Sequence, residues 1–324
     1  MTPVSRPSAA PRRGRLFRVT AAVAVLLALA GYVVVQYLNG GGGSGPPRCT
    51  AGSSDGTTYE LSPEQAVNAA TISAVGTSRG MPERAVTIAL ATALQESGLR
   101  NLDHGDLDSL GLFQQRPSQG WGTTKQIMDP VYSARKFYEH LDKVHDYAHL
   151  PLTVAAQRVQ RSAFPEAYAK HEPDAALLAS ALTGRAPASF TCSATKSAVA
   201  GDPAKVRARL AREFGPGVLP AGRPAPSTDV RLPVHGTKAA AGGTAHRTGS
   251  GPGTGAGSGS GKQRGWELAH WAVANSAALG IERVSYGGRV WAAGTDETSW
   301  GKADTRSGGT AGQSPDEVRI SLAK

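Results

Sequence analysis

One glutamate, Glu96, stands at the end of an apolar, alanine-rich stretch and has the setting that acid–base chemistry requires. It occurs in the run Gln95–Leu99, which reads Gln-Glu-Ser-Gly-Leu. Burial near a helix end disfavours the charged form of a carboxylate, so its pKa rises and it can donate a proton near neutral pH. Cleavage of a glycosidic bond needs such an acid at the leaving oxygen. The alternative is a structural Glu96 that caps a turn or pairs with Arg100 or Arg116.

A more acidic segment follows Glu96. It contains Asp103, Asp106 and Asp108. One of these could supply a second catalytic carboxylate, which glycoside hydrolysis commonly uses. Asp106, Asp108 and Ser109 also offer closely spaced oxygens for Ca²⁺, but the ligand series is incomplete. A solvated acidic loop is the simplest interpretation, and we expect no metal in this chain.

The elements that must position Glu96 are predicted to be helices. Ser62-Pro63-Glu64-Gln65 predicts a capped helix start, and apolar residues at helical spacing continue to Arg79-Gly80. A second helix is predicted from Met81-Pro82-Glu83 to Glu96, with Gly98 as its stop. Residues 99–124 show no sustained hydrophobic periodicity, which predicts a long functional loop region. Further helices are predicted from Asp129 through Leu141, from Thr153 to Gln160 and from Pro165 to Ala181. Residues 49–192 are therefore predicted to be mainly α, with no strands.

Two motifs in this region resemble those of a known enzyme family. Glu96-Ser97 is similar to the Glu-Ser motif of the lysozyme-like (SLT-type) lytic transglycosylases, and Gly111–Gln114 resembles their Gly-Leu-Met-Gln loop with Phe113 in the Met position. The resemblance implies a mainly α, lysozyme-like domain that cleaves the MurNAc–GlcNAc bond of peptidoglycan. Glu96 would be the sole acid/base, and the substrate's N-acetyl group would replace a second carboxylate and lead to a 1,6-anhydro product. The implied substrate-binding residues are Ser97, Gly111, Leu112, Phe113, Gln114, Tyr132 and Tyr138.

The N-terminal part of the chain predicts a membrane anchor. Residues 16–38 form an apolar run of the length that spans a bilayer, and the first 38 residues carry five arginines and no acid. The positive-inside rule places a basic tail, residues 1–15, in the cytoplasm and residues 39–324 outside the membrane. A cleaved signal peptide is the alternative, but the bulky end of the run at Tyr32–Leu38 favours a retained single transmembrane helix. Residues 39–48 are a flexible spacer.

The two cysteines, Cys49 and Cys192, flank the first globular region. In an extracytoplasmic protein they predict a disulfide that closes this region at both ends. A bridge across so long a loop stabilises by about 4–5 kcal/mol in the chain-entropy model. Two unpaired thiols are the alternative.

The net charge of +10 lies mainly in the N-terminal tail and in residues 193–264, a basic linker rich in Gly, Pro and Ala. The candidate folded parts are near neutral, which argues against a folded nucleic-acid-binding face. A basic tether favours anionic wall polymers or lipid headgroups as partners. The sequence predicts no cofactor.

Residues 265–324 predict a small α+β C-terminal domain. An apolar helix-spaced set runs from Trp266 to Leu279, followed by strands at Ile281–Tyr286 and Arg289–Ala292 around a Gly287-Gly288 turn, and a last strand at Val318–Leu322. This part resembles a C-terminal domain of actinobacterial wall proteins whose relatives are zinc peptidases. Here only Asp316 remains of the ligand positions, so the resemblance implies a degenerate, metal-free module. Trp271, Trp291 and Trp300 are expected to be core residues, with a sugar-stacking platform as the alternative.

Two functions follow as hypotheses. The first is a membrane-anchored extracytoplasmic enzyme that cleaves peptidoglycan glycan strands, as a lytic transglycosylase or a muramidase. The second is a non-catalytic wall-associated protein that keeps the fold for glycan binding or scaffolding.

Overall fold

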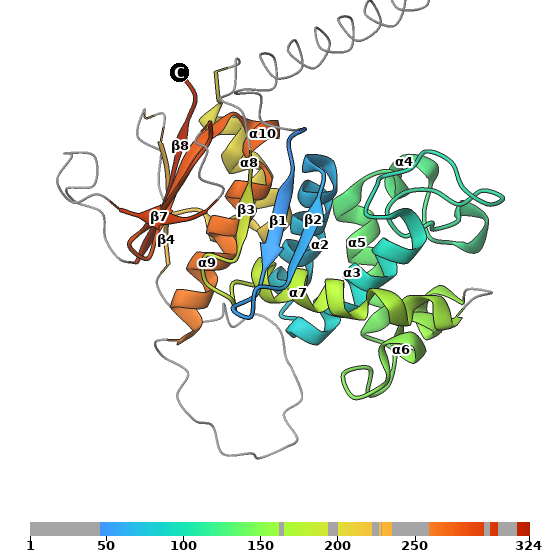
Figure 1. Ribbon diagram of the computed structural model, residues 1–324. Coiled ribbons are helices and arrows are strands. Elements are labelled where there is room, and N and C mark those ends of the chain that lie inside the picture. The colour runs from blue at the N-terminus through green and yellow to red at the C-terminus, as the bar shows by residue number, and fades with distance from the viewer. Residues whose placement is uncertain are drawn as a thin grey trace, which may run out of the picture. The chain divides into compact units, whose positions relative to one another are not determined.

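Figure 1 shows the computed structural model of the protein. Its first two helices begin and end where short-range sequence signals predict. The structure describes residues 46–161, 165–193, 200–221, 227, 229–234, 259–294, 299–303 and 316–324. Helix α2, Pro63–Ser78, begins with the predicted capping box between Ser62 and Gln65. Helix α3, Glu83–Ser97, ends at Gly98, which adopts the left-handed conformation with φ 61°. Both predictions are confirmed, because caps and left-handed glycines are determined locally.

Shorter helices complete this part and pack around α2 and α3. They include the predicted helices, except that the segment from Pro165 begins as a 3₁₀ helix and becomes α-helical only after His171. The bounds are η1 Pro117–Gln119, α4 Thr124–Ile127, α5 Pro130–Leu141, α6 Leu152–Gln160, η2 Pro165–His171 and α7 Glu172–Leu182.

The prediction that residues 49–192 contain no strands is wrong. Strands β1 (Cys49–Gly52), β2 (Thr58–Leu61) and β3 (Phe190–Cys192) form an antiparallel sheet in the order β2-β1-β3. Each strand has only three or four residues, too few for a visible alternation. Cys49 lies opposite Cys192 in this sheet and is joined to it by the predicted disulfide.

A second antiparallel sheet follows the order β4-β8-β5-β6-β7. Its predicted hairpin and last strand are confirmed as β5 Ile281–Tyr286, β6 Arg289–Ala292 and β8 Glu317–Leu322, with β7 at Gly301–Lys302. Strand β4, Asp229–Pro233, pairs with β8 although it comes from the predicted linker. The same segment contains α8, Pro203–Phe214, and η3, Pro216–Val218, so part of the predicted linker is structured.

Helix α9, Gly259–Ala274, lies between this sheet and the first region (Figure 1). The short helix α10, Ser276–Leu279, follows it. Helix α9 packs against α2, α7 and β3 on one side and against β5 and β8 on the other. Residues Pro47–Lys324 thus form one compact unit. The domain boundaries given above stay predictions.

The observed fold class is mixed α+β, with many helices and two antiparallel sheets among the described residues. None of the helices in the described ranges is long and apolar enough to cross a membrane. The predicted basic tail, transmembrane helix and most of the spacer, up to residue 45, lie outside the described residues.

Candidate functional site

The last turn of α3 carries Glu96, and α2 holds the end of this helix in place. Gly98 stops α3, and its carbonyl accepts a hydrogen bond from Gln65 Nε2 at 2.9 Å. The carbonyl of Leu99 accepts another from Asn68 Nδ2 at 2.8 Å. The backbone beside Glu96 is therefore held by two side chains of α2.

The carboxylate of Glu96 is mostly buried and has polar but uncharged partners. Tyr168 Oη donates a hydrogen bond to Glu96 Oε1 at 2.6 Å. Burial raises the pKa of Glu96 above its ordinary value, while hydrogen bonds from the Tyr168 and Gln160 side chains lower it in part. Among the described residues no Arg, Lys or His forms an ion pair with Glu96. The predicted alternative partner Arg116 instead binds Asp108, with Nε to Oδ1 at 2.7 Å.

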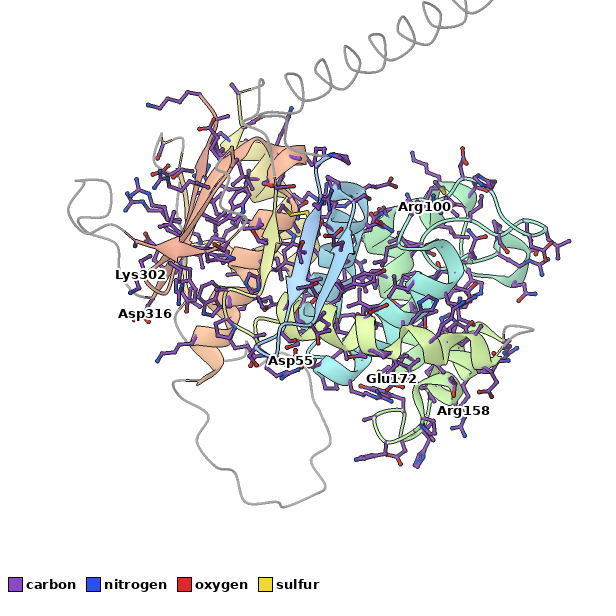
Figure 2. All side chains as sticks on the ribbon, in the orientation of Figure 1. Asp55, Arg100, Arg158, Glu172, Lys302 and Asp316 are labelled. Atoms are coloured by element: carbon purple, nitrogen blue, oxygen red, sulfur yellow. A yellow bond between two sulfur atoms is a disulfide. The ribbon has the colours of Figure 1, made fainter. Side chains whose placement is uncertain are left out.

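Arg100, the other cation considered for Glu96, points its Nε to the Ser97 carbonyl at 3.5 Å. Figure 2 shows this side chain on the helical side of the molecule. A carboxylate that is desolvated and lacks a cation exchanges its proton at a higher pH than an exposed one. Glu96 therefore has the electrostatic setting of a proton donor.

Ser97 ties α3 to the Gly111–Gln114 loop. Its hydroxyl lies 2.8 Å from the Leu112 carbonyl and 3.1 Å from the Ala93 carbonyl, and the residue is 5% exposed. The resemblance implied that Ser97 contacts the substrate. The structure gives its hydroxyl a backbone partner in the loop, and its predicted role in orienting the sugar's acetamido group or Glu96 stays a prediction.

Gly111 occupies a place in this loop that only glycine fills without strain. Its φ is +75°, and a Cβ there would lie 2.9 Å from the Ile127 carbonyl. Its amide donates to the Leu102 carbonyl at 2.7 Å, and Leu110 and Gln115 form a two-way backbone bridge at 3.0 Å. The loop is thus held rigidly beside the end of α3.

Three of the predicted substrate-binding side chains are in the core. Leu112, Phe113 and Tyr138 are fully buried, and the Phe113 ring stacks on Phe137 at 4.7 Å. Tyr138 donates its hydroxyl to the Ile72 carbonyl at 3.0 Å. In this conformation their side chains face the core, and their predicted role in holding the glycan, through the loop backbone in particular, stays a prediction.

Gln114 and Tyr132 remain at the surface in part. Gln114 has φ 47°, and its Nε2 lies 3.3 Å from the carbonyls of His104 and Gly111. Tyr132 donates its hydroxyl to the Trp121 carbonyl at 3.2 Å. They stay candidates for substrate contact.

The three acids of the loop differ in their surroundings. Asp108 is held by Arg116 and by the amide and hydroxyl of Ser118, and these hydrogen bonds keep its pKa far below the ordinary value. Asp103 is exposed, and its hydrogen bond to His104 lowers its pKa. Asp106 is exposed. Asp108 therefore works as the anchor of η1 and is a poor proton donor.

Sequence reasoning missed the side chain that hydrogen bonds to Glu96. Tyr168 lies in η2, 72 residues further along the chain. It was not singled out as a motif in the sequence, and a contact over such a separation leaves no local pattern.

The C-terminal tryptophans are core residues, as expected. Trp271, Trp291 and Trp300 are 1%, 1% and 4% exposed, which excludes a sugar-stacking platform in this conformation.

Asp316 precedes β8 at the end of the second sheet (Figure 2). Within the described ranges no three His, Cys, Asp or Glu side chains come together as a metal site requires.

A family model described as VldE, C-terminal domain, matches residues 229–313. The matched range begins at β4 and includes α9, α10 and β5 to β7. No curated protein matches the chain. The match covers less than a third of the chain and excludes α3 and the loop beside it, so the chemistry of Glu96 rests on the geometry of its own site.

Proposed function

We propose that the protein cleaves the glycan strands of peptidoglycan, with Glu96 as general acid and base. The observation that carries the proposal is the mostly buried Glu96 carboxylate, which accepts a hydrogen bond from the Tyr168 hydroxyl and has no cation partner among the described residues. Burial favours its protonated form, and a protonated carboxylic acid is what the leaving oxygen of a glycoside needs. The similarity of Glu96-Ser97 and Gly111–Gln114 to lytic transglycosylase motifs supplies the substrate class.

The neighbouring acids favour a mechanism with one carboxylate. Asp108 is already bound by Arg116 and Ser118, and Asp103 by His104. Glu96 then donates its proton to the glycosidic oxygen while the bond from C1 to that oxygen breaks. The carbonyl oxygen of the substrate's N-acetyl group attacks C1 and forms a cyclic oxazolinium. The C6 hydroxyl next attacks C1, the bond to the acetyl oxygen breaks, and Glu96 takes the hydroxyl proton, which gives a 1,6-anhydro sugar.

The location belongs to the same proposal. The apolar run at residues 16–38 would anchor the chain in the membrane by one helix and place residues 39–324 outside the cytoplasm. The disulfide between Cys49 and Cys192 supports an oxidising compartment. The helices around α3 would form a lysozyme-like domain, and the C-terminal part would be a metal-free module related to zinc peptidases. Peptidoglycan and anionic wall polymers would be its partners.

The test is release of muropeptides from peptidoglycan sacculi by the purified full chain. Glu96→Gln should lower the rate about 10²–10⁴-fold, which is the usual contribution of a general acid–base group. Glu64→Gln is a matched control, because Glu64 is exposed on α2. Mass spectrometry of the products identifies the mechanism, since an anhydro end means transglycosylation and a reducing end means hydrolysis.

Two results would overturn the proposal. One is no release by the wild-type protein, and the other is equal release by wild type and Glu96→Gln. Binding of the inactive wild type to sacculi would then support the non-catalytic, wall-associated function.

A further inference from the structure

A cavity of about 800 Å³ lies beside the first sheet, and its described lining residues include neither Glu96 nor the Gly111–Gln114 loop. Three segments form its walls: the turn between β1 and β2, part of α7, and residues 185–191, which lead into β3. The pairing of β1 with β3 brings these segments together although they are far apart in the sequence. The volume is within the range of sites that bind small molecules.

One wall of the cavity is a face of the first sheet that carries hydroxyl groups. Thr50 lies opposite Thr191 in the register of β1 and β3, and both line the cavity. Their neighbours Ala51 and Phe190 are fully buried, because successive residues of a strand point to opposite faces of the sheet. A hydroxyl both donates and accepts hydrogen bonds, so this wall suits the N–H and C=O groups of a peptide.

Arg185 brings a cation to the cavity in a fixed position. Its Nε donates to the two carboxylate oxygens of Glu83, at the start of α3, at 2.9 and 2.7 Å. The terminal nitrogens of the guanidinium donate no hydrogen bond within the part of the chain that the structure describes, and the side chain is 60% exposed. A guanidinium held through Nε can present its two terminal nitrogens to a carboxylate of a ligand.

An acid, Asp55, lines the same cavity from the turn between β1 and β2 (Figure 2). Its Oδ1 accepts hydrogen bonds from the Ser53 hydroxyl and from the Thr57 amide, the latter at 2.9 Å, so the turn is tied together by the carboxylate itself. The cavity thus contains one cation and one acid. This pair suits a ligand that carries both a carboxylate and an amine.

The apolar part of the lining is made of small side chains. Ala176, Ala186 and Ala188 contribute methyl groups, and no aromatic ring is among the described lining residues. Ala188 has φ 53°, a left-handed conformation that costs free energy in a residue with a Cβ and that is often found at ligand sites. Methyl-sized contacts without a ring fit alanine side chains better than the face of a sugar.

We propose that this cavity binds a short, alanine-containing peptide, with Arg185 on a carboxylate of the peptide and Asp55 on an amine. The peptide stems of peptidoglycan have this chemistry, since they contain alanine, free carboxylates and a diamino acid. In naming the stem as the ligand, the inference rests on the proposed function. It adds a second site, which holds the substrate by its peptide while Glu96 acts on the glycan.

The experiment is titration calorimetry of the full chain with a soluble stem tetrapeptide made of alanine, glutamate, lysine and alanine. Arg185→Gln should raise Kd about 10–100-fold, the usual loss for a hydrogen bond to a charged group. Asp55→Asn should also raise Kd, because it keeps the acceptor of the turn and removes the charge. Arg158→Gln is the matched control, since Arg158 is exposed on α6 and does not line the cavity (Figure 2).

A further variant tests the cavity without changing a charge. Ala176 is exposed on α7, so Ala176→Trp places a large ring in the cavity and leaves the core unchanged. We expect this variant to lose binding of the tetrapeptide while its urea denaturation curve stays that of the wild type.

Three results would overturn the inference. They are no binding of the tetrapeptide by the wild type, equal binding by wild type and Arg185→Gln, and binding of a peptide-free N-acetylglucosamine tetramer that Ala176→Trp abolishes. The last result would make the cavity a glycan site. None of these measurements involves cleavage, so they can fail or succeed whatever Glu96→Gln does to the release of muropeptides.

Discussion

The end of α3 and the contact between α2, α8 and α9 both bury a glutamate, but they compensate its charge differently. Glu213, on α8, accepts hydrogen bonds from Arg209 Nε at 2.7 Å, Trp271 Nε1 at 2.6 Å and Thr71 Oγ1 at 3.1 Å. Glu96 accepts a hydrogen bond from the Tyr168 hydroxyl and has no cation partner within the described ranges. A cation keeps a buried carboxylate ionised, whereas its absence favours the protonated acid.

A third glutamate, Glu267, combines burial with a cation partner. It is buried on α9, where Arg264 Nη1 lies 2.7 Å from one oxygen and the hydroxyl of Thr77 binds the other. Burial raises the pKa of Glu267, and the Arg264 guanidinium reduces that rise without cancelling it, so Glu96 and Glu267 differ in their partners more than in the direction of this effect. The carboxylates of Glu213 and Glu267 each bind a hydroxyl of α2, so they join α2 to the C-terminal part of the chain. The carboxylate of Glu96 binds the Tyr168 hydroxyl instead, a contact that a neutral acid can also make.

The largest expected effect is the loss of Glu213. Glu213→Ala removes the acceptor of the buried Trp271 indole and leaves Arg209 without its partner, so the free energy of unfolding should fall by about 3 kcal/mol. Urea denaturation of the full chain measures it. Glu60→Ala is the control, because Glu60 pairs with Arg48 at the surface and should cost less than about 1 kcal/mol. Equal, small losses in both variants would contradict a connecting role for Glu213.

The same contact contains a group that should make stability depend on pH. His270 is fully buried, and its Nδ1 lies 2.7 Å from the Ala181 carbonyl. Burial lowers the pKa of His270 to about 4, below the value of about 6.5 in an unfolded chain. The unfolded state therefore binds the proton first, and about 3 kcal/mol of stability that is complete above pH 6.5 should be lost as the pH falls through 4.

His270→Asn should remove this part of the pH dependence. Asparagine keeps a donor for the Ala181 carbonyl and does not titrate. The measurement is the free energy of unfolding between pH 7 and pH 4, with the exposed His145→Asn as the control. An unchanged slope in His270→Asn would mean that another group takes up the proton.

A smaller effect is expected at the edge of the first sheet. Strand β3 presents its carbonyls to the C-terminal part, where Trp300 Nε1 donates to Phe190 at 2.8 Å and Trp291 Nε1 to Cys192 at 3.1 Å. Trp300→Phe leaves the buried Phe190 carbonyl without this donor and should cost about 2 kcal/mol. Trp121→Phe, at a half-buried indole, should cost less. Equal losses in the two variants, measured by urea denaturation, would show that ring volume and not the hydrogen bond carries the effect.

The features that sequence reasoning predicted are those that neighbouring residues determine. The capping box of Ser62 and Gln65, the stop at Gly98 and the Gly287-Gly288 hairpin each depend on residues a few positions apart. The disulfide was predictable as well, because the chain has only two cysteines. Strands β1 to β3 were not, since β3 pairs with β1 across more than 130 residues and each strand is short.

The site was predictable to a smaller extent. Glu96 could be found from its place at the end of an apolar, alanine-rich stretch and from the Glu-Ser motif, but its partner Tyr168 comes from an element that reaches it only in the folded chain. Phe113 and Tyr138 were assigned to a substrate, although both lie in the core. An aromatic residue in a motif looks the same in the sequence whether its ring faces a ligand or a helix. Only the burial of the ring in the folded chain distinguishes the two.

The smallest expected change, and the one of opposite sign, is in the stability of Glu96→Gln. Burial raises the pKa of Glu96, so ionised Glu96 destabilises the folded state. Below the ordinary pKa of glutamate both side chains are neutral, and wild type and variant should be equally stable. As pH rises through the raised pKa the wild type loses stability that the neutral glutamine keeps, and the Tyr168 hydroxyl can still donate to the amide oxygen. We expect a gain of about 0.5–2 kcal/mol at pH 7, the usual size of a single stabilising substitution.

Measured beside Glu213→Gln, this variant tests the comparison itself. Glutamine at position 213 loses the ion pair with Arg209 and should destabilise the fold, whereas Glu96 has no ion pair in the described part of the chain that a glutamine would remove. The free energy of unfolding of both variants is measured at pH 4 and pH 7, with the exposed Glu64→Gln as the reference. At pH 7 it should be lower than wild type for Glu213→Gln and higher than wild type for Glu96→Gln. Destabilisation by Glu96→Gln at pH 7 would place Glu96 with Glu213 as a structural carboxylate, because a proton donor held by uncharged partners has no charge that the fold requires.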